Sequence, residues 1–153
     1  MLAQHQAMIE QFSAAYAELT AEKIAHFPDL YADDVVFIDP VQQVYGVQDL
    51  QIYFFRIIEK TYYHRVKVIR AFSSENDLFI LWELSYAHAN LEQGDDITVE
   101  GASHLRWEGE RIIFQRNYYD MGAMLYEHIP LISRVVRYMK GKIAGFNHYG
   151  ELF

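Results

Sequence analysis

Apolar residues recur at helical spacing near the start of the chain. Met8, Phe12, Ala15, Tyr16 and Leu19 fall at i, i+4, i+7, i+8 and i+11, which places them on one stripe of a helix. Such a stripe buries its apolar side against a core. The spacing therefore predicts a first helix that packs on the rest of the domain.

Two more helical segments are predicted before residue 61. Pro28 interrupts the first pattern, and a short second helix is expected to end at Asp33 and Asp34. After Gly46, apolar residues again keep helical spacing and predict a third helix that ends near Lys60. Three helices thus precede most of the strands.

The remaining patterns are those of strands. The run VVFIDPVQQVYG at residues 35–46 is rich in β-branched residues, and Pro40 ends regular pairing just after Asp39. Beyond Thr61, four long strands separated by turn residues are predicted at residues 63–72, 78–89, 97–107 and 112–120. Helices followed by such a meander indicate an α+β domain, with a curved antiparallel sheet packed on three N-terminal helices.

Composition and charge exclude several classes of protein. The chain of 153 residues has no cysteine, which rules out disulfides and thiolate chemistry. Its net charge of −8 argues against nucleic-acid binding, which needs clustered Lys and Arg. The N-terminus has neither a basic region nor an uninterrupted apolar run, so a soluble cytoplasmic protein is expected.

The end of the chain is basic, although the body is acidic. Residues 131–150 hold four of the thirteen Lys and Arg residues and none of the twenty-one acidic residues. Residues 131–146 form an amphipathic pattern, with one apolar arc and one basic arc. The chain is therefore divided into a domain at residues 1–125 and a C-terminal helical extension of it at residues 126–153. The apolar arc is expected to pack on the domain or on a partner subunit, and the alternative is peripheral contact with an anionic membrane.

The order of these elements, and the sequence of three segments, resembles the NTF2-like superfamily. The segments are FSAAYAELTAEKIAHFPDLYADDVVFIDPVQQVYGVQDLQIYF, ASHLRW and QRNYYDMGAML. They are most similar to the SnoaL-like branches of that superfamily, which include ketosteroid isomerases and polyketide cyclases. The resemblance spans about residues 5–125 and implies a cone-shaped fold that encloses an apolar pocket.

The resemblance also implies catalytic residues. Asp39 matches the carboxylate with which the isomerases move a proton beside a carbonyl group, and Tyr16 matches the tyrosine that stabilises the oxyanion. Ser103 stands where the isomerases have a protonated Asp, and its neutral hydroxyl is a weaker donor. In the cyclase branch an aromatic-Asp pair ends the last strand, and Tyr119 and Asp120 match that pair. His104, on the neighbouring strand, is then a partner for Asp120.

Each of these residues also has a purely structural interpretation. Asp39 before a proline is an ordinary strand terminator, and Tyr16 on the apolar stripe is an ordinary core tyrosine. Strand alternation places residues 115, 117 and 119 on one face and Asp120 on the other. If the odd set faces the pocket, as in the isomerases, Asp120 enters it only through a twist or bulge. Otherwise Asp120 is expected to pair with Arg106 or Arg116 on the outer face.

These observations predict a cofactor-independent isomerase or cyclase that transfers a proton on a small hydrophobic carbonyl compound. Asp39 or Asp120 exchanges the proton, and Tyr16, Ser103 or Asn117 holds the developing oxyanion. The predicted ligand-binding residues are Ser103, Asn117, Tyr119, Trp82, Phe37 and His104. The rival hypothesis is a non-catalytic module that binds lipid-like molecules or another protein.

Two further expectations concern metals and partners. No metal site is predicted, because the seven histidines include no close ligand pair such as HExxH. A homodimer is expected, because a long curved sheet with an apolar outer face seldom stays uncovered. Strand register places either Leu81 or Trp82 on that outer face.

Overall fold

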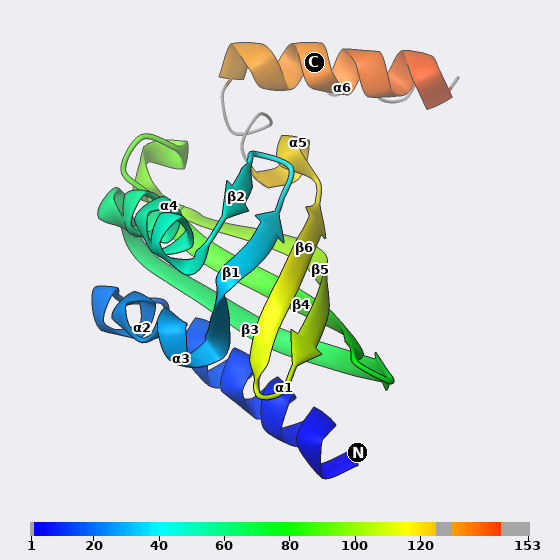
Figure 1. The fold of residues 1–153 in the computed structure, drawn as a ribbon. Coiled ribbons are helices and arrows are strands. Elements are labelled where there is room, and N and C mark those ends of the chain that lie inside the picture. Colours follow the sequence, from blue (N-terminus) through cyan, green and yellow to red (C-terminus); the bar gives the residue numbers. More distant parts are fainter. Residues whose placement is uncertain (1, 125–129, 145–153) are drawn as a thin grey trace.

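The computed structural model describes residues 2–124 and 130–144 and has the predicted α+β architecture (Figure 1). A six-stranded curved sheet forms one layer, and the helices α1 to α4 cover one of its faces. The fold therefore has a concave side on which helices and sheet enclose a common interior.

The helical part contains one more segment than the sequence pattern predicts. Its helices are α1 (Leu2–Tyr16), α2 (Ala21–Ala25), α3 (Phe27–Leu30) and α4 (Val47–Glu59). The predicted stripe of the first helix is confirmed by the burial of Met8, Phe12 and Tyr16, whereas Leu19 is buried just beyond the helix end. The short second helix is two helices, because Pro28 lies in the first turn of α3, where a missing N–H is tolerated.

The expected helix end at Asp33 and Asp34 is wrong. Both residues lie inside strand β1 (Tyr31–Ile38), which starts directly after α3. Tyr31, Val35 and Phe37 are fully buried on one side of β1, and this alternation fixes the segment as a strand.

The strands follow the predicted order. The segment at residues 35–46 forms the end of β1 and the short β2 (Gln43–Tyr45), and the four long strands are β3 (Thr61–Ser74), β4 (Asp77–His88), β5 (Asp96–Glu108) and β6 (Arg111–Tyr119). A short 3-10 helix, η1 (Glu92–Gly94), lies between β4 and β5. The sheet order is β2-β1-β6-β5-β4-β3.

One strand pair departs from the predicted antiparallel sheet. The meander from β3 to β6 is antiparallel, but β1 pairs with β6 in parallel, with Phe37 opposite Gln115 and Ile38 opposite Arg116. Continuing this register by one residue brings Asp39 beside Asn117. The parallel pair therefore places the end of β1 next to the inward-facing residues of β6.

An aromatic cluster fills the interior between helices and sheet. Phe27 contacts the rings of Tyr16, Tyr31 and Phe54 at centroid distances of 5.8, 5.2 and 5.5 Å. Phe54 also contacts Phe37 at 5.5 Å, which joins α4 to β1. These contacts hold α1, α3, α4 and β1 in fixed relative positions at one side of the concave interior.

The C-terminal part consists of α5 (Met121–Met124) and α6 (Pro130–Ala144), and α6 begins at Pro130. In Figure 1, α6 lies apart from the sheet. Its apolar arc is exposed in the single chain, with Ile132, Val135, Tyr138 and Met139 all more than 40 % exposed. The arc thus does not pack on the domain within the described residues. The predicted domain boundary at residues 125–126 lies outside the described residues, as do residues 126–129 and 145–153 of the predicted extension.

The outer face of the sheet carries apolar side chains. Of the two residues considered for this face, Leu81 is 43 % exposed, whereas Trp82 is buried on the concave side. Phe72, Phe79 and Tyr118 are also exposed and are placed near Leu81 by the strand register.

Candidate functional site

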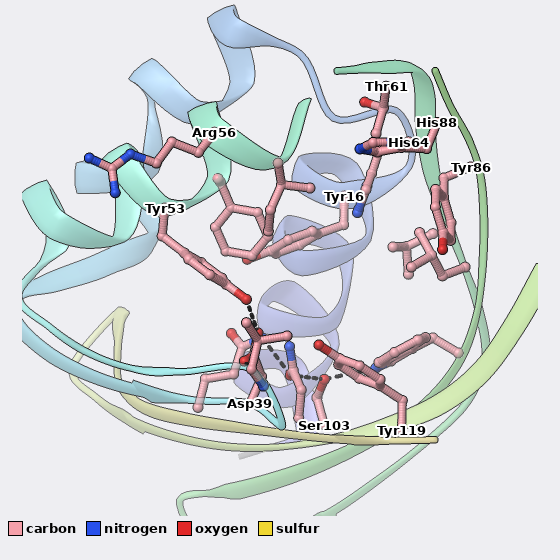
Figure 2. A pocket seen from close by; sticks show the side chains of 18 of the residues that line it. Tyr16, Asp39, Tyr53, Arg56, Thr61, His64, Tyr86, His88, Ser103 and Tyr119 are labelled. Atoms are coloured by element: carbon pink, nitrogen blue, oxygen red, sulfur yellow. Dashed lines mark hydrogen bonds between the residues drawn. The ribbon is translucent and has the colours of Figure 1, made fainter. Parts of the chain in front are cut away.

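A cavity of about 270 Å³ lies between the sheet and the helices α1 and α4. Most of its lining is apolar or aromatic, and Figure 2 shows Asp39, Ser103 and Tyr119 on one side of the cavity and Thr61, His64 and His88 on another. Val41 and Arg56 are lining residues whose side chains are exposed, so the cavity opens near the β1–β2 turn and α4. Ligand sites usually combine an apolar lining with a few placed polar groups in this way.

Asp39 lies at one end of the cavity, where β1 turns into β2. Its Oδ1 accepts hydrogen bonds from the backbone N–H groups of Val41 at 2.8 Å and Gln42 at 2.9 Å. Its Oδ2 accepts a hydrogen bond from the hydroxyl of Tyr53 on α4 at 2.5 Å. The side chain thus serves as strand terminator and as cavity group at once, because one oxygen closes the turn and the other meets Tyr53. Asp39 is the only acidic residue that lines the described cavity.

A chain of hydrogen-bonded side chains runs along the wall next to Asp39. It joins, in order, Tyr16, Tyr31, Gln115, Asn117, Ser103 and Trp82, over distances of 2.5 to 2.9 Å. Strand register builds this chain, because Ser103 on β5 stands opposite Asn117 on β6. The group of Asp39, Tyr53, Tyr119 and this chain is here called the acid end of the cavity.

The indole of Trp82 determines which atom is the donor in each of these hydrogen bonds. An indole N–H can only donate, so Ser103 Oγ accepts from Trp82 Nε1 and gives its own proton to Asn117 Oδ1. Asn117 Oδ1 also accepts from Gln115 Nε2, which turns Gln115 Oε1 toward the hydroxyl of Tyr31. Since Tyr31 donates to Gln115, the hydroxyl of Tyr16 is the donor to Tyr31.

This direction decides which groups can donate to a ligand. The protons of Tyr16 and Ser103, both predicted to hold an oxyanion, are committed to Tyr31 and Asn117. Asn117 uses only its oxygen, and its Nδ2 donates no hydrogen bond to the described residues. Asn117 is therefore the member of the chain whose donor remains for a ligand.

Two tyrosines beside Asp39 keep their protons. Burial, followed by the charge of Asp39, raises the pKa of both Tyr53 and Tyr119 well above the ordinary range. Burial also raises the pKa of Tyr16. Figure 2 shows the hydroxyl groups of Tyr53 and Tyr119 turned toward the space around Asp39 and Ser103. All of these hydroxyls are neutral near pH 7, so they act as donors and not as bases.

The opposite end of the cavity is formed by the adjoining ends of β3 and β4, with Thr61, His64, Tyr86 and His88 (Figure 2). This group is here called the histidine end. His64 is only 7 % exposed, and its Nδ1 has no hydrogen-bond partner among the described residues. Burial lowers its pKa to about 4, so the imidazole is neutral at pH 7.

The structure brings six of the predicted site residues to the cavity. These are Asp39, Tyr16, Ser103, Asn117, Tyr119 and Trp82. The inward orientation expected for the odd-numbered residues of the last strand agrees with this placement. The roles assigned to these residues stay predictions.

The other three predicted residues lie elsewhere. Phe37 is fully buried behind Tyr53 and Phe54 and contributes to the wall rather than to the lining. His104 lies on the outer face, where its Nε2 is 2.7 Å from Asp77 Oδ1 and its ring stacks on Phe79.

Asp120 is also outside the cavity. It is 56 % exposed, accepts a hydrogen bond from the backbone N–H of Gly122 at 2.8 Å, and lies 3.3 Å from Lys140 Nζ on α6. The bulge that would turn it inward is not observed, because the register shift between β5 and β6 lies at Arg106 and Trp107. Asp39 is thus the carboxylate that the fold presents to the cavity.

Sequence reasoning missed several residues of the site, among them Tyr53, Tyr31, Gln115 and His64. Tyr53 lies beside the apolar stripe of α4, and only the tertiary fold shows that it reaches Asp39. His64 could have been found from strand alternation, because it shares a face with Val66 and Val68 of β3. Nothing local indicates that its Nδ1 stays without a partner.

The fold and the cavity define a class of protein: a small cone-shaped α+β domain with an internal apolar pocket. The model of the SnoaL-like domain matches residues 9–115. This chain belongs to the SnoaL-like domain family. None of the curated proteins matches it at a significant level.

Solved structures support the same fold at low sequence identity. A candidate SnoaL-like polyketide cyclase from Jannaschia sp. CCS1 is 13% identical, with a TM-score of 0.71 over 83% of this chain and 92% of that chain. A hypothetical protein with a ketosteroid isomerase-like fold from Catenulispora acidiphila, in complex with trimethylamine, is 16% identical, with a TM-score of 0.68 over 79% of this chain and 91% of that one. A candidate isomerase of the SnoaL-like family from Agrobacterium tumefaciens is 21% identical, with a TM-score of 0.62 over 77% of this chain and 98% of that one.

Within residues 2–124 and 130–144, no group of three or more His, Asp or Glu side chains is placed to hold a metal ion. In the same part of the chain, none of the helices has the length and apolar character needed to cross a bilayer.

Proposed function

We propose that this protein is a cofactor-independent enzyme that moves a proton beside the carbonyl group of a small hydrophobic compound, as an isomerase or a cyclase does. One observation carries the proposal. A single carboxylate, fixed by three hydrogen-bond donors, lies at the same end of an apolar cavity as an amide whose donor is unused. General-base catalysis next to a carbonyl needs these two groups and no metal ion.

The mechanism assigns one role to each group. Asp39 Oδ2 takes a proton from the carbon beside the carbonyl group, and the electrons of the broken C–H bond form an enolate. The charge moves to the carbonyl oxygen, where Asn117 Nδ2 and the hydroxyl of Tyr119 act as donors. Asp39 then returns its proton in one of two ways. In a β,γ-unsaturated ketone the γ-carbon takes the proton, which shifts the double bond. In a ring closure the enolate carbon attacks a second carbonyl carbon of the substrate, the C=O π bond breaks, and the alkoxide oxygen takes the proton. In both reactions Asp39 takes up one proton and gives one proton back, so it ends in its starting state.

The neighbouring groups prepare this chemistry. Two backbone N–H groups and the hydroxyl of Tyr53 hold the carboxylate in one orientation, so little reorganisation is needed when the proton moves. Tyr16, Tyr31, Gln115, Ser103 and Trp82 act as positioning residues, because their hydrogen bonds fix the orientation of the Asn117 amide. The names of the similar structures, an isomerase and a polyketide cyclase, agree with proton transfer on a carbonyl compound.

The experiment uses a medium-sized β,γ-unsaturated ketone, whose conversion to the conjugated isomer is followed by ultraviolet absorbance. The variant Asp39→Asn is expected to lose activity by a factor of about 10² to 10⁴, the usual contribution of a general base. Asp120→Asn serves as the matched control, because Asp120 is exposed and does not line the cavity. Loss of activity in Asp120→Asn with full activity in Asp39→Asn would contradict the proposal.

The second candidate function is a binding module without catalysis. It is favoured by the commitment of the Tyr16 and Ser103 protons inside the protein, which leaves fewer donors for an oxyanion than the isomerases have. Two results together would support this function instead: calorimetry shows that the ketone binds, and the rate of ketone isomerisation is equal with wild type, with Asp39→Asn and in buffer.

A further inference from the structure

The cavity has polar groups at two separate ends, and the proposed chemistry uses only one of them. The acid end contains Asp39 and Asn117. The histidine end, with Thr61, His64, Tyr86 and His88, takes no part in the proton transfer. Figure 2 shows the two groups on opposite sides of the cavity, with the apolar lining between them.

His64 is the residue of the histidine end whose side chain lacks a hydrogen-bond partner among the described residues. Its side chain lines the cavity and is more than nine-tenths buried, yet Nδ1 has no partner among the described residues. A buried nitrogen without a hydrogen bond destabilises the folded state, because the nitrogen loses its hydrogen bond to water on folding and gains none in return. An apolar side chain is compatible with this face of β3, because the next residue on the same face is Val66.

The neighbours of His64 do not meet this need. The Thr61 hydroxyl donates to the backbone carbonyl of Ile58 at 3.1 Å, and His88 Nδ1 accepts the backbone N–H of Asn90 at 3.0 Å. The backbone carbonyl of His64 accepts the N–H of Leu19 at 2.8 Å, which fixes the position of the residue without using its ring. The imidazole ring of His64 therefore lines the cavity without a hydrogen bond to the described residues.

The sheet register gives the separation of the two ends. His64 stands opposite Tyr86 on β4, whereas the acid end meets β4 at Trp82, which donates to Ser103. These two positions on β4 are four residues apart, or about 13 Å at the usual rise of a strand. A ligand that reaches both ends must therefore be elongated.

Resting on the proposed function, we propose that the substrate is an elongated apolar carbonyl compound with a second neutral oxygen, a hydroxyl or a carbonyl group, that hydrogen-bonds to His64. The first carbonyl lies at the acid end, and the apolar middle lies against the lining between the ends. A charged group is disfavoured at the histidine end, because the imidazole is neutral and the other described residues of that end, Thr61, Tyr86 and His88, include no Lys, Arg, Asp or Glu. A hydroxyl suits either tautomer of the ring, since it both donates and accepts.

The test compares two ligands that differ at one end. The probes are 2-decanone and 10-hydroxydecan-2-one, and their dissociation constants are measured by calorimetry with the full chain. The hydroxyketone is expected to bind about fivefold to tenfold more tightly, as for one added net hydrogen bond. This advantage is expected to vanish in His64→Leu, whereas the affinity for 2-decanone is expected to stay within about twofold.

A second readout does not depend on a variant that folds. The imidazole ¹⁵N resonances of His64 in the wild type should shift with 10-hydroxydecan-2-one and stay in place with 2-decanone. Equal dissociation constants for the two probes, or an unchanged resonance with both, would overturn the inference.

The outcomes also separate this inference from the proposed function. Equal affinities combined with isomerisation of the unsaturated ketone would overturn the two-ended ligand and leave the proton transfer standing. A His64-dependent advantage without any isomerisation would support the two-ended ligand and contradict catalysis. Failure of both probes to bind would overturn the inference together with the ligand-binding role of the cavity.

Discussion

The buried histidine predicts a specific dependence of stability on pH. In the folded protein the pKa of His64 lies at about 4, compared with an ordinary value of 6.5 that also applies to the unfolded chain. Between these values the unfolded chain binds a proton and the folded chain does not. Acid therefore favours unfolding, so the free energy of unfolding falls as the pH drops below 6.5 and stops falling at about pH 4.

The size of the effect follows from the shift. Each pH unit inside this window changes the free energy of unfolding by about 1.4 kcal/mol. From pH 7 to pH 5, His64 alone should therefore remove about 2 kcal/mol of stability, a large part of the marginal stability of a small domain. Replacing His64 by Leu removes this proton and also removes a buried nitrogen without a partner.

The assay is urea unfolding of wild type and His64→Leu at pH 7 and pH 5. The variant is expected to be about 1 kcal/mol more stable at pH 7, because an unsatisfied buried polar atom costs roughly 1 to 3 kcal/mol. At pH 5 the advantage should grow to about 3 kcal/mol. His26→Gln is the control, because His26 is 70 % exposed and its replacement should leave the pH profile unchanged. Parallel profiles for wild type and His64→Leu would refute the reasoning.

Four more predictions follow from other parts of the structure. Tyr53→Phe removes one of three donors to Asp39, so kcat should fall about tenfold while KM stays nearly constant; Tm should also fall, because a hydrogen bond to a charged group contributes about 1.5 to 3 kcal/mol to stability. Gly101→Ala should lower Tm and weaken ketone binding, because a Cβ at this position would overlap the ring of Trp82, whereas Gly109→Ala, with open space around it, should leave ketone binding unchanged. If copies of the chain pair through the exposed sheet face, light scattering should give twice the 18.0 kDa mass for wild type and the single mass for Leu81→Glu. If the exposed apolar arc of α6 adsorbs to membranes, the protein should sediment with anionic vesicles and not with neutral ones, and replacing Val135 and Met139 by Asp should abolish this.

Much of the fold was predictable because it depends on local periodicity. The stripe of α1, the stripe of α4 and the four long strands are all visible as repeats of apolar residues. The start of β1 was missed because Asp33 and Asp34 resemble a helix end, although burial of Tyr31 and Val35 makes this segment a strand. The parallel pairing of β1 with β6 was missed for a related reason, since no local pattern encodes which distant strand becomes a neighbour.

The lining residues that match family positions or follow strand alternation, such as Tyr16, Ser103 and Asn117, were predictable, and so was a carboxylate at a strand end. Asp39 before Pro40 is such a case, and the structure places it in the cavity lining. The hydrogen bond from Tyr53 and the chain from Tyr16 to Trp82 join residues far apart in sequence, so they depend on tertiary packing. Asp120 shows the opposite case, because its resemblance to a family position is clear but the end of β6 continues without a bulge and leaves it exposed.

The central claim is that Asp39 accepts a proton from a carbonyl compound held in the cavity, and hydrogen–deuterium exchange tests this step directly. In deuterated buffer, NMR follows loss of the protons at C1 and C3 of 2-decanone, which requires proton abstraction but no shift of a double bond. The account predicts exchange that is faster with wild type than in buffer, and a return to the buffer rate with Asp39→Asn. Equal exchange rates with wild type, with Asp39→Asn and in buffer, under conditions where calorimetry shows the ketone bound, would contradict it.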